Sequence, residues 1–373
     1  MHDQHARRQV ARGPLPMPAF QHVSCEMMLA SFCNLSCKYC IAGKLHPSKM
    51  DINTARKAIE LFVYLAEGAS DLEVVFTGGE PLLAQEVFIF LLSHTTALCD
   101  SIRMKPHFIL KTNGTIITDT LVQYLKDFRV RTVVSIDGRA DFHDSCRMSR
   151  KGEATQNLVM RNLSRLESKG IECVASMTVV PEFSNQIVDN TRYLLGNGIR
   201  KVDIGPAYGT VTWSNEEIKR LTDSLLQIAE IIKASRMNGE DVEIGPLYKD
   251  SDHQDGALAD TWGCHACSSN LAFLPEGDIS GCSSLAMLSP KHPELIIGNV
   301  ENGVDQPSLD AVLHLVQASL SYRPICKKCN SAENCSGGCL AINLSEKEMP
   351  HIPPNFYCAC IGILPKALRL AWN

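Results

Sequence analysis

The sequence lacks three features that would each point to a partner: a basic stripe, a secretory signal and a long apolar run. Lys and Arg number 36 against 41 Asp and Glu, both signs are mixed along the chain, and the formal net charge is -5. Without a basic stripe to track a phosphate backbone, nucleic acid is not an expected partner. The start, MHDQHARRQ, is polar, and no run of 18 apolar residues follows. We therefore expect neither a signal peptide nor a membrane span, and a cytoplasmic protein.

Disulfides are not expected in a reducing compartment, yet the chain has 16 cysteines among 373 residues. Such a number in a cytosolic protein indicates metal binding. Three cysteines fall within SFCNLSCKYC, residues 31–40, and nine lie between Cys264 and Cys360. The other four are scattered and are interpreted as small buried hydrophobes: Cys25, Cys99, Cys146 and Cys173.

The first two thirds of the chain alternate short apolar or β-branched runs with amphipathic helical patterns, which predicts βα units and a parallel sheet. The length and an apolar fraction of 45% allow a second domain. Six βα units predict an α/β fold, a partial TIM-like barrel with a lateral mouth and its chemistry at the carboxyl ends of the strands. The expected strands are Cys25–Ala30, Leu72–Phe76, His107–Leu110, Thr132–Ile136, Glu172–Val179 and Lys201–Ile204.

Four motifs follow consecutive predicted strands. The cysteine triplet follows the first strand, FTGGEP the second, TNG the third, and SIDG with the downstream HDSCR the fourth. Each motif alone is typical of an ordinary turn. Their coincidence at one end of a parallel sheet indicates a single site.

The triplet raises the question of why there are only three sulfurs. Zinc sites and ferredoxin-type clusters normally take four protein ligands. A triplet therefore implies either a remote fourth cysteine or a metal position that is left open.

Cys33-x3-Cys37-x2-Cys40 together with Gly78-Gly79-Glu80-Pro81 resembles the radical S-adenosylmethionine (SAM) superfamily. The resemblance implies that the three cysteines bind three irons of a [4Fe-4S] cluster and that SAM chelates the fourth iron. It also implies reductive cleavage of SAM to a 5'-deoxyadenosyl radical that abstracts hydrogen from the substrate.

The same resemblance implies roles for further residues. Gly78, Gly79 and Glu80 would meet the methionine amino group, and Ser135 and Arg147 would hold the methionine carboxylate. Tyr39 would lie near adenine, and Asn113 would contact the cofactor. Plain packing of Tyr39 and a surface salt bridge of Arg147 are the alternatives.

The cysteine-rich end reads CxxC with a further cysteine 15 residues on, then CxxCx5Cx3C, then CxC. A zinc ribbon would leave five of these cysteines idle. The pattern resembles the SPASM extension of radical SAM enzymes, which carries two auxiliary [4Fe-4S] clusters. That resemblance assigns Cys267, Cys282 and Cys339 to the first cluster and Cys326, Cys329, Cys335 and Cys358 to the second. The fourth ligand of the first cluster is Cys264 or an open position, and either Cys358 or Cys360 is spare.

We therefore expect four segments. An N-terminal extension covers 1–22, the barrel 23–212, a bridging helix and loop 213–258, and the SPASM domain 259–373. The bridging helix is predicted over Ser214–Ala234, where Ser214 and Glu217 form a capping box.

The resemblance is strongest to ribosomal-peptide maturases, which implies a precursor peptide as substrate, an external electron donor such as flavodoxin or ferredoxin, and a crosslinked (carbon-carbon or thioether) or epimerised product. Only 32 residues precede Cys33, so we expect leader binding by the barrel, the cluster domain or a separate protein. Epimerisation would need a hydrogen-donating thiol, for which the candidates are Cys25, Cys146, Cys173, Cys264 and Cys360.

Three alternatives stay open. Anaerobic sulfatase maturases carry an aspartate, able to act as a base, where this chain has Ser283, which disfavours formylglycine formation. A small-molecule epimerase or dehydrogenase of the aminoglycoside type is the second. A non-catalytic iron-sulfur scaffold is the third, and it would leave the intact triplet, Glu80 and Arg147 without a purpose.

Overall fold

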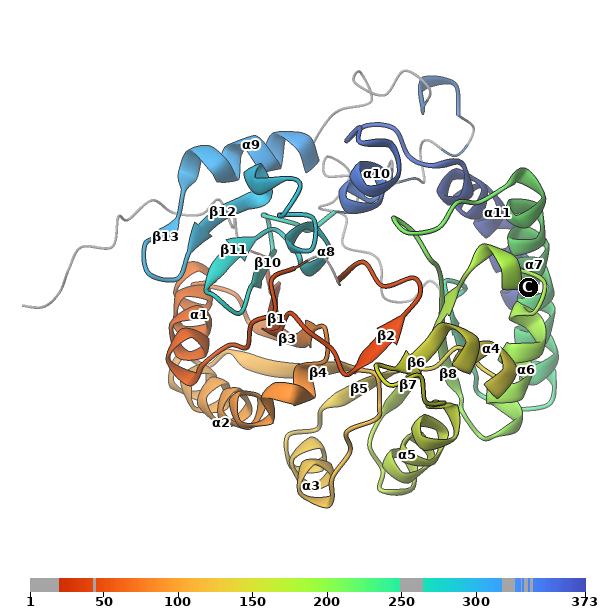
Figure 1. Ribbon diagram of the computed structural model, residues 1–373, viewed down its shortest axis with the longest axis horizontal. Coiled ribbons are helices and arrows are strands. Elements are labelled where there is room, and N and C mark those ends of the chain that lie inside the picture. The colour runs from red at the N-terminus through yellow and green to blue at the C-terminus, as the bar shows by residue number, and fades with distance from the viewer. Residues whose placement is uncertain are drawn as a thin grey trace, which may run out of the picture.

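The computed structural model describes residues 20–42, 45–248, 264–316, 326–329, 331, 335 and 338–373. Its main feature is one eleven-stranded sheet with the strand order β13-β12-β11-β10-β1-β3-β4-β5-β7-β8-β9 (Figure 1). The sheet curves around a centre, and helices lie along its outer side (Figure 1). This arrangement confirms the α/β class and the open barrel.

All six predicted barrel strands are present and parallel to their neighbours. A seventh parallel strand, β9 (Glu243–Gly245), pairs with β8 and was not predicted, because three residues are too few to produce a recognisable alternation. The six are β1 (His22–Ala30), β3 (Asp71–Gly78), β4 (Lys105–Thr112), β5 (Arg131–Ser135), β7 (Cys173–Val179) and β8 (Lys201–Pro206).

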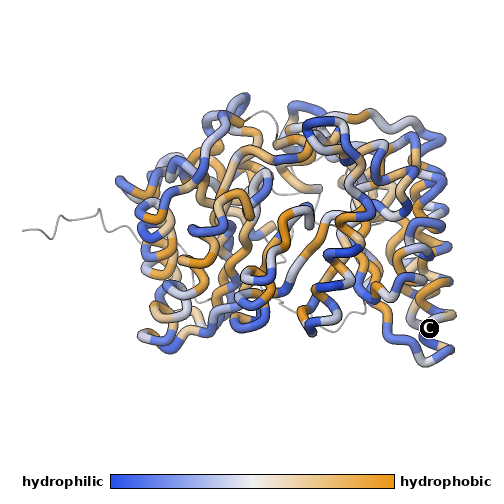
Figure 2. Tube along the Cα trace, turned by 60° about the horizontal axis from the view of Figure 1, so that its bottom comes forward, coloured by the Kyte–Doolittle hydropathy of each residue, from blue (hydrophilic) through white to orange (hydrophobic). Residues whose placement is uncertain are grey.

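Apart from the short helix at Ala140–Cys146, which packs in a separate cluster with Tyr39 and Val180, the helices bury one face each against the outer side of the barrel sheet. In Figure 2 the helices alternate hydrophobic and hydrophilic residues along the tube, as expected for elements with one apolar stripe. Phe62 of α1, Phe88 of α2 and Leu163 of α5 are among the fully buried residues of this core. The helices are α1 (Ile52–Leu65), α2 (Gln85–Ile102), α3 (Asp119–Asp127), α4 (Ala140–Cys146), α5 (Gln156–Ser168), α6 (Ile187–Gly196) and α7 (Asn215–Met237).

The bridging helix α7 begins at the predicted capping box, in which Ser214 and Glu217 bond each other's backbone N–H groups. It packs against the C-terminal helix α11 (Asn355–Trp372). Arg236 donates to the carbonyl of Ala371 at 2.8 Å, and its guanidinium lies 4.8 Å from the centre of the Trp372 ring. The end of the chain is therefore tied to the barrel.

The cysteine-rich part shares the barrel's sheet. Strand β10 (Asn270–Phe273) pairs in parallel with β1, from Ser24 opposite Asn270 to Met27 opposite Phe273. A short antiparallel meander extends the sheet, and three helices accompany it. These elements are β11 (Asp278–Ser280), α8 (Ser283–Ala286), β12 (Ile296–Asn299), β13 (Gly303–Val304), α9 (Gln306–Val316) and α10 (Leu340–Lys347).

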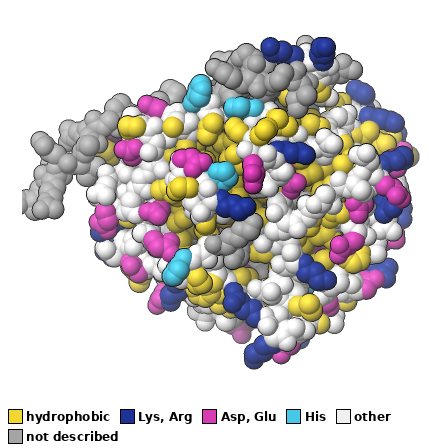
Figure 3. Space-filling view, turned by 45° about the horizontal axis from the view of Figure 1, so that its top comes forward, with side chains coloured by type: hydrophobic (Ala, Val, Ile, Leu, Met, Phe, Trp, Pro, Cys, Tyr) yellow, Lys and Arg dark blue, Asp and Glu magenta, His cyan; other side chains and the backbone are white. Residues whose placement is uncertain are grey.

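Among the described residues, one helical stretch, Pro81–Ile102, has the length and composition of a membrane-crossing helix. Phe88, Leu91 and Leu92 within it are fully buried in the core, so packing on the sheet accounts for its apolar side. On the face seen in Figure 3, charges of both signs are interspersed with apolar side chains, and no single-sign patch stands out.

Candidate active site

The cysteine triplet lies on the loop after β1, and a short antiparallel ladder fixes that loop. Strand β2 (Leu35–Cys37) pairs with β6 (Arg147–Ser149), which places Cys37 opposite Arg147. Lys38 N–H donates to the carbonyl of Cys146 at 3.0 Å, which extends the contact by one residue. The triplet and the downstream arginine are therefore held together by backbone.

The three thiols of the triplet face a common region. Burial raises the pKa of Cys37 to about 12, nearby Arg147 lowers it, and the neighbouring thiols of Cys40 and Cys33 raise it further. Within the described ranges, no three His, Cys, Asp or Glu side chains stand close enough to share one metal ion. A four-iron cluster takes one sulfur per iron, so its ligands stand farther apart than those of a single ion. The triplet fits such a cluster better than it fits zinc.

Gly78 and Gly79 allow the loop after β3 to lie directly against the triplet loop. A Cβ at Gly78 would come within 2.3 Å of the Ala30 carbonyl oxygen, and one at Gly79 within 2.3 Å of the Phe32 oxygen. Gly79 N–H donates to Ala30 at 2.7 Å, and Glu80 N–H donates to Phe32 at 3.0 Å. The sequence predicted a close approach to a ligand here, and the structure adds a close approach of the chain to itself.

Glu80 is fully buried and joins the loops after β3 and β4. One carboxylate oxygen accepts from Leu82 N–H at 3.0 Å and from the Thr112 hydroxyl at 2.8 Å, and the other accepts from Asn113 N–H at 2.8 Å. Burial raises the pKa of Glu80 to about 7, against these hydrogen bonds, which lower it. A carboxylate has about four acceptor positions, so one is left for a further donor.

Asn113 reaches back to the triplet. Its Nδ2 lies 3.4 Å from the Cys33 sulfur and donates to the Asn34 Oδ1 at 2.8 Å. Burial raises the pKa of Cys33, whereas the hydrogen bonds from Leu35 N–H and Asn113 lower it. The amide therefore stabilises negative charge on that sulfur.

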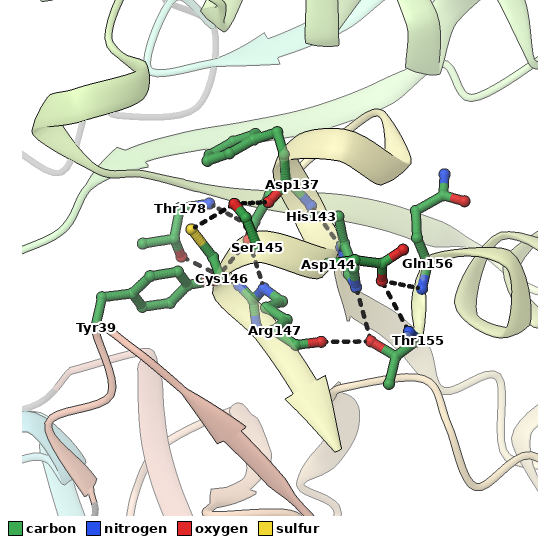
Figure 4. Close-up of polar contacts among 11 residues, drawn as sticks. Tyr39, Asp137, His143, Asp144, Ser145, Cys146, Arg147, Thr155, Gln156 and Thr178 are labelled. Carbon is green, nitrogen blue, oxygen red and sulfur yellow. Dashed lines mark hydrogen bonds and ion pairs between the residues drawn. The ribbon is translucent and has the colours of Figure 1, made fainter. Parts of the chain in front are cut away.

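Asp137, the carboxylate of the SIDG motif, is the centre of a buried polar cluster that the sequence did not single out (Figure 4). One of its oxygens accepts from the Tyr39 hydroxyl at 2.7 Å and from Arg147 Nε at 2.8 Å. Arg147 is 7% exposed and its guanidinium lies 5.0 Å from the centre of the Tyr39 ring. The alternative of a surface salt bridge for Arg147 is therefore wrong, because the ion pair that it makes is buried.

His143 joins the same cluster through two hydrogen bonds of its ring (Figure 4). Its Nδ1 accepts from Asp137 N–H at 3.2 Å, so its Nε2 carries the proton and donates to the Thr155 hydroxyl at 3.1 Å. That hydroxyl donates to the Arg147 carbonyl at 2.6 Å. Burial lowers the pKa of His143 to about 4, which keeps the ring neutral. The motif HDSCR thus contains a structural histidine.

Ser135 ends β5 on the inner face of the barrel sheet, the face away from the helices. It pairs with Ser176 of β7, and Ser176 pairs with Asp203 of β8, which forms one polar row. Asp203 and, on β4, Lys111 are exposed, although β8 and β4 each pair with a neighbouring strand on both sides. The inner face is therefore open to a ligand.

Four cysteines of the C-terminal part form one group. Cys267 is fully buried and takes a left-handed φ of 63°, while Cys282 and Cys339 precede the first turns of α8 and α10. Burial chiefly raises the pKa of Cys282, and Glu26, Cys339 and Cys264 raise it further. Burial and the Cys264 thiol raise the pKa of Cys267 to about 12. Cys264 therefore lies near Cys267 and Cys282, two of the three cysteines that the sequence pattern assigned.

A second group surrounds Cys358. Burial and then the thiols of Cys326, Cys335 and Cys329 raise the pKa of Cys358 to about 11. Cys360, two residues along α11, instead packs beside the apolar core. Of this pair, Cys358 is the one that faces the other cysteines.

Ser283, the residue that follows Cys282, is hydrogen-bonded to a carboxylate from the barrel. Glu26 of β1 accepts from the Ser283 hydroxyl and from its N–H, the latter at 3.3 Å. The other oxygen of Glu26 accepts from Asn270 at 2.9 Å. Strand β1 of the barrel therefore supplies an acidic group, Glu26, beside Cys282.

Comparisons with known proteins identify a family and several relatives of this chain. Residues 27–195 match the Radical SAM superfamily. The chain is 24% identical over 326 residues to the serine-type anaerobic sulfatase-maturating enzyme of Klebsiella aerogenes, covering 83% of this chain and 77% of that protein. It is 25% identical over 174 residues to the sporulation killing factor maturation protein SkfB of Bacillus subtilis (strain 168), covering 46% and 40%.

Solved structures share the fold. The structure of anSMEcpe with bound AdoMet has a TM-score of 0.77 at 20% identity and covers 94% of this chain and 98% of that chain. The structure of Streptococcus suis SuiB bound to precursor peptide SuiA has a TM-score of 0.63 at 15% identity, covering 91% and 76%.

Proposed function

Residues 27–195 identify this chain as a radical SAM enzyme, and we propose that it modifies a peptide. Membership of the superfamily implies SAM and a [4Fe-4S] cluster and excludes the non-catalytic scaffold. A relative that covers 83% of this chain is named for maturation of sulfatases, one that covers 46% of it is named for maturation of a killing factor, and SuiB is known with a precursor peptide. A peptide substrate is the reading that these relatives share.

In this proposal the residues of the site hold cofactor and cluster in the following way. When bound, the cluster and SAM supply a 5'-deoxyadenosyl radical that takes hydrogen from the substrate. Cys33, Cys37 and Cys40 ligate the cluster, and Asn113 polarises Cys33. Ser135 and Arg147 receive the methionine carboxylate, and Glu80, through its remaining acceptor position, receives the amino group. Tyr39 lies under the Arg147 guanidinium at the edge of this site.

The two C-terminal cysteine groups each fit one auxiliary cluster. We assign Cys264, Cys267, Cys282 and Cys339 to the first, because Cys264 lies near Cys267 and Cys282. We assign Cys326, Cys329, Cys335 and Cys358 to the second, which leaves Cys360 as the spare thiol. Both sets supply four sulfurs, the number that a closed [4Fe-4S] cluster requires.

The observation that carries the proposal is the placement of two cysteine sites along one strand. The triplet follows the end of β1 at Ala30. Cys282 lies beside Glu26, which precedes Ala30 on that strand by four residues, or roughly 13 Å. The open inner face with Lys111 and Asp203 belongs to the same sheet. A substrate held there would stand between the radical source and an electron acceptor.

The free thiols bear on the reaction type. Cys25 and Cys173 are buried with the helices on the outer side of the sheet, away from the inner face. Cys146 is buried against Tyr39, and Cys360 packs beside the core. Epimerisation would have to use one of the last two, whereas crosslinking needs no thiol donor, so we place crosslinking first.

Formylglycine formation is a second candidate because of Glu26. Its carboxylate stands beside Ser283, close to the position that carries the maturase aspartate, and could accept a proton from a substrate held on the inner face. Glu26→Gln would separate the two candidates, since only a reaction that uses this base would slow.

The experiment is an anaerobic incubation of the reconstituted chain with SAM, dithionite and the short peptides encoded beside its gene, followed by mass spectrometry. Loss of two hydrogens indicates a crosslink or an oxidation, and uptake of one solvent deuterium indicates epimerisation. Cleavage of SAM with every peptide unchanged would count against a peptide substrate and favour a small molecule.

A further inference from the structure

We propose that Asp137 is a positioning residue that couples the triplet loop to Arg147 and thereby sets the affinity for SAM. The inference rests on the proposed role of Arg147 as the group that receives the methionine carboxylate. Asp137 itself is fully buried and all of its contacts described below are to the protein chain. It acts on the cofactor through its neighbours.

The first observation is that one oxygen of Asp137 serves two elements at once. Oδ2 accepts from the hydroxyl of Tyr39, which stands between Cys37 and Cys40, at 2.7 Å. The same oxygen accepts from Nε of Arg147, at 2.8 Å. A carboxylate shared in this way fixes the distance between the triplet loop and the guanidinium (Figure 4).

The second observation is a closed ring of contacts that orients the guanidinium. Asp137 Oδ1 accepts from Thr178 N–H at 2.9 Å, and the Thr178 hydroxyl accepts from Arg147 Nη2 at 3.2 Å. Together with the Tyr39 ring at 5.0 Å, these contacts hold the planar group on three sides. Of its five N–H donors, Nε and one on Nη2 are taken by these contacts, which leaves three for a carboxylate ligand.

The third observation is burial. Arg147 is 7% exposed and Asp137 fully buried, so each charge depends on the other for compensation. Removing one partner of a buried pair leaves the other uncompensated, and it then rotates toward any available anion or water. A guanidinium released from Asp137 would no longer present its free donors at the place where the methionine carboxylate is received.

Backbone geometry makes this coupling direct. Cys37 and Arg147 are partners in the β2–β6 ladder. The His143 ring accepts from Asp137 N–H and donates to the Thr155 hydroxyl, which in turn donates to the Arg147 carbonyl. His143 therefore connects the two ends of the segment 137–147. A purely structural ion pair would lower the stability when broken but would leave SAM affinity unchanged. SAM affinity is therefore the quantity that separates the two roles.

The test compares Asp137→Asn with Asp141→Asn in the reconstituted full chain, without peptide. Asp141, in the first turn of α4, pairs with Arg139, but both side chains are more than half exposed, so it is the matched control. The measurements are the SAM dissociation constant by equilibrium dialysis, the iron content and the change that SAM causes in the EPR spectrum of the reduced N-terminal cluster. We expect Asp137→Asn to keep its iron and to bind SAM about 10–100-fold more weakly, with the EPR change restored at higher SAM.

Unchanged SAM affinity in an iron-loaded Asp137→Asn protein would overturn the inference. If that variant fails to fold, Thr178→Val decides, because it removes only the Nη2 contact. A weaker SAM affinity in Thr178→Val supports the coupling and an unchanged one refutes it. The SAM-binding assay contains no peptide, so it can be interpreted even if the proposed peptide reaction proves wrong. Conversely, an unchanged SAM affinity would not argue against the peptide reaction.

Discussion

Cys37 and Arg147 face each other as partners in a two-stranded ladder, so a triplet cysteine and the buried arginine move as one unit. Arg150 strengthens the link, since its Nε donates to the Cys33 carbonyl at 2.7 Å. The loop that would bind a cluster and the loop that would bind its ligand are thus one structural element.

Gly79→Ala should disrupt the triplet loop. The added methyl would lie 2.3 Å from the Phe32 carbonyl oxygen and 2.5 Å from its carbon, which are backbone atoms without a rotamer to adopt. We expect loss of iron from the N-terminal site and a fall of about 100-fold in SAM cleavage, because the reacting groups are displaced. Gly196→Ala is the control, since a Cβ there meets nothing within 4 Å. Full iron content in the Gly79 variant would show that the loops can separate without consequence.

Asn113→Ala should lower the reduction potential of the N-terminal cluster. The Nδ2 group lies 3.4 Å from the Cys33 sulfur, and hydrogen bonds to cluster sulfurs raise the potential by stabilising added negative charge. Redox titration followed by EPR measures the midpoint. An unchanged or more positive midpoint would mean that this contact does not form in the loaded enzyme.

His143 should lower the free energy of unfolding as the pH falls below about 6.5. Its folded pKa is about 4 and its ordinary value is 6.5, so between these values the unfolded chain binds more protons and stability rises with pH. The loss on going from pH 6.5 to pH 4 is roughly 3 kcal/mol for this group. In the His143→Asn variant the urea midpoint should depend less on pH within that window. Above pH 6.5 the midpoints of variant and wild type should change with pH by the same amount. Equal slopes below pH 6.5 would contradict a neutral buried ring.

Cys358→Ala and Cys360→Ala should differ in iron content. The wild type should hold about twelve irons per chain, the content of three four-iron clusters. We expect the Cys358 variant to lose the iron of one cluster, because its thiol faces Cys326, Cys335 and Cys329, and the Cys360 variant to keep all of it. Equal losses, or zinc in place of iron, would contradict the second ligand group.

The six barrel strands and the capped helix α7 could be predicted because alternation and capping are local signals. The pairing of β10 with β1 could not, since four residues carry no information on which strand they will join. The cysteine-rich part extends the barrel's own sheet, an arrangement that no local pattern in these residues predicts.

The site divides in a similar way. Spacing identified the triplet and the paired glycines, but not Asp137, whose role depends on contacts with Tyr39, Arg147 and Thr178 from three other segments. Choosing between Cys358 and Cys360 likewise required the direction in which each thiol points from α11. Contacts of this kind form only in the folded chain.

The central claim is that the triplet and SAM drive radical chemistry on a peptide, and one assay tests it most directly. The reconstituted wild type and a variant with Cys33, Cys37 and Cys40 replaced by alanine are incubated anaerobically with SAM, dithionite and the candidate peptides, and 5'-deoxyadenosine and peptide mass are measured together. The account predicts 5'-deoxyadenosine and a modified peptide from the wild type, and neither from the variant, which still holds its C-terminal iron. Production of 5'-deoxyadenosine by the variant would contradict it.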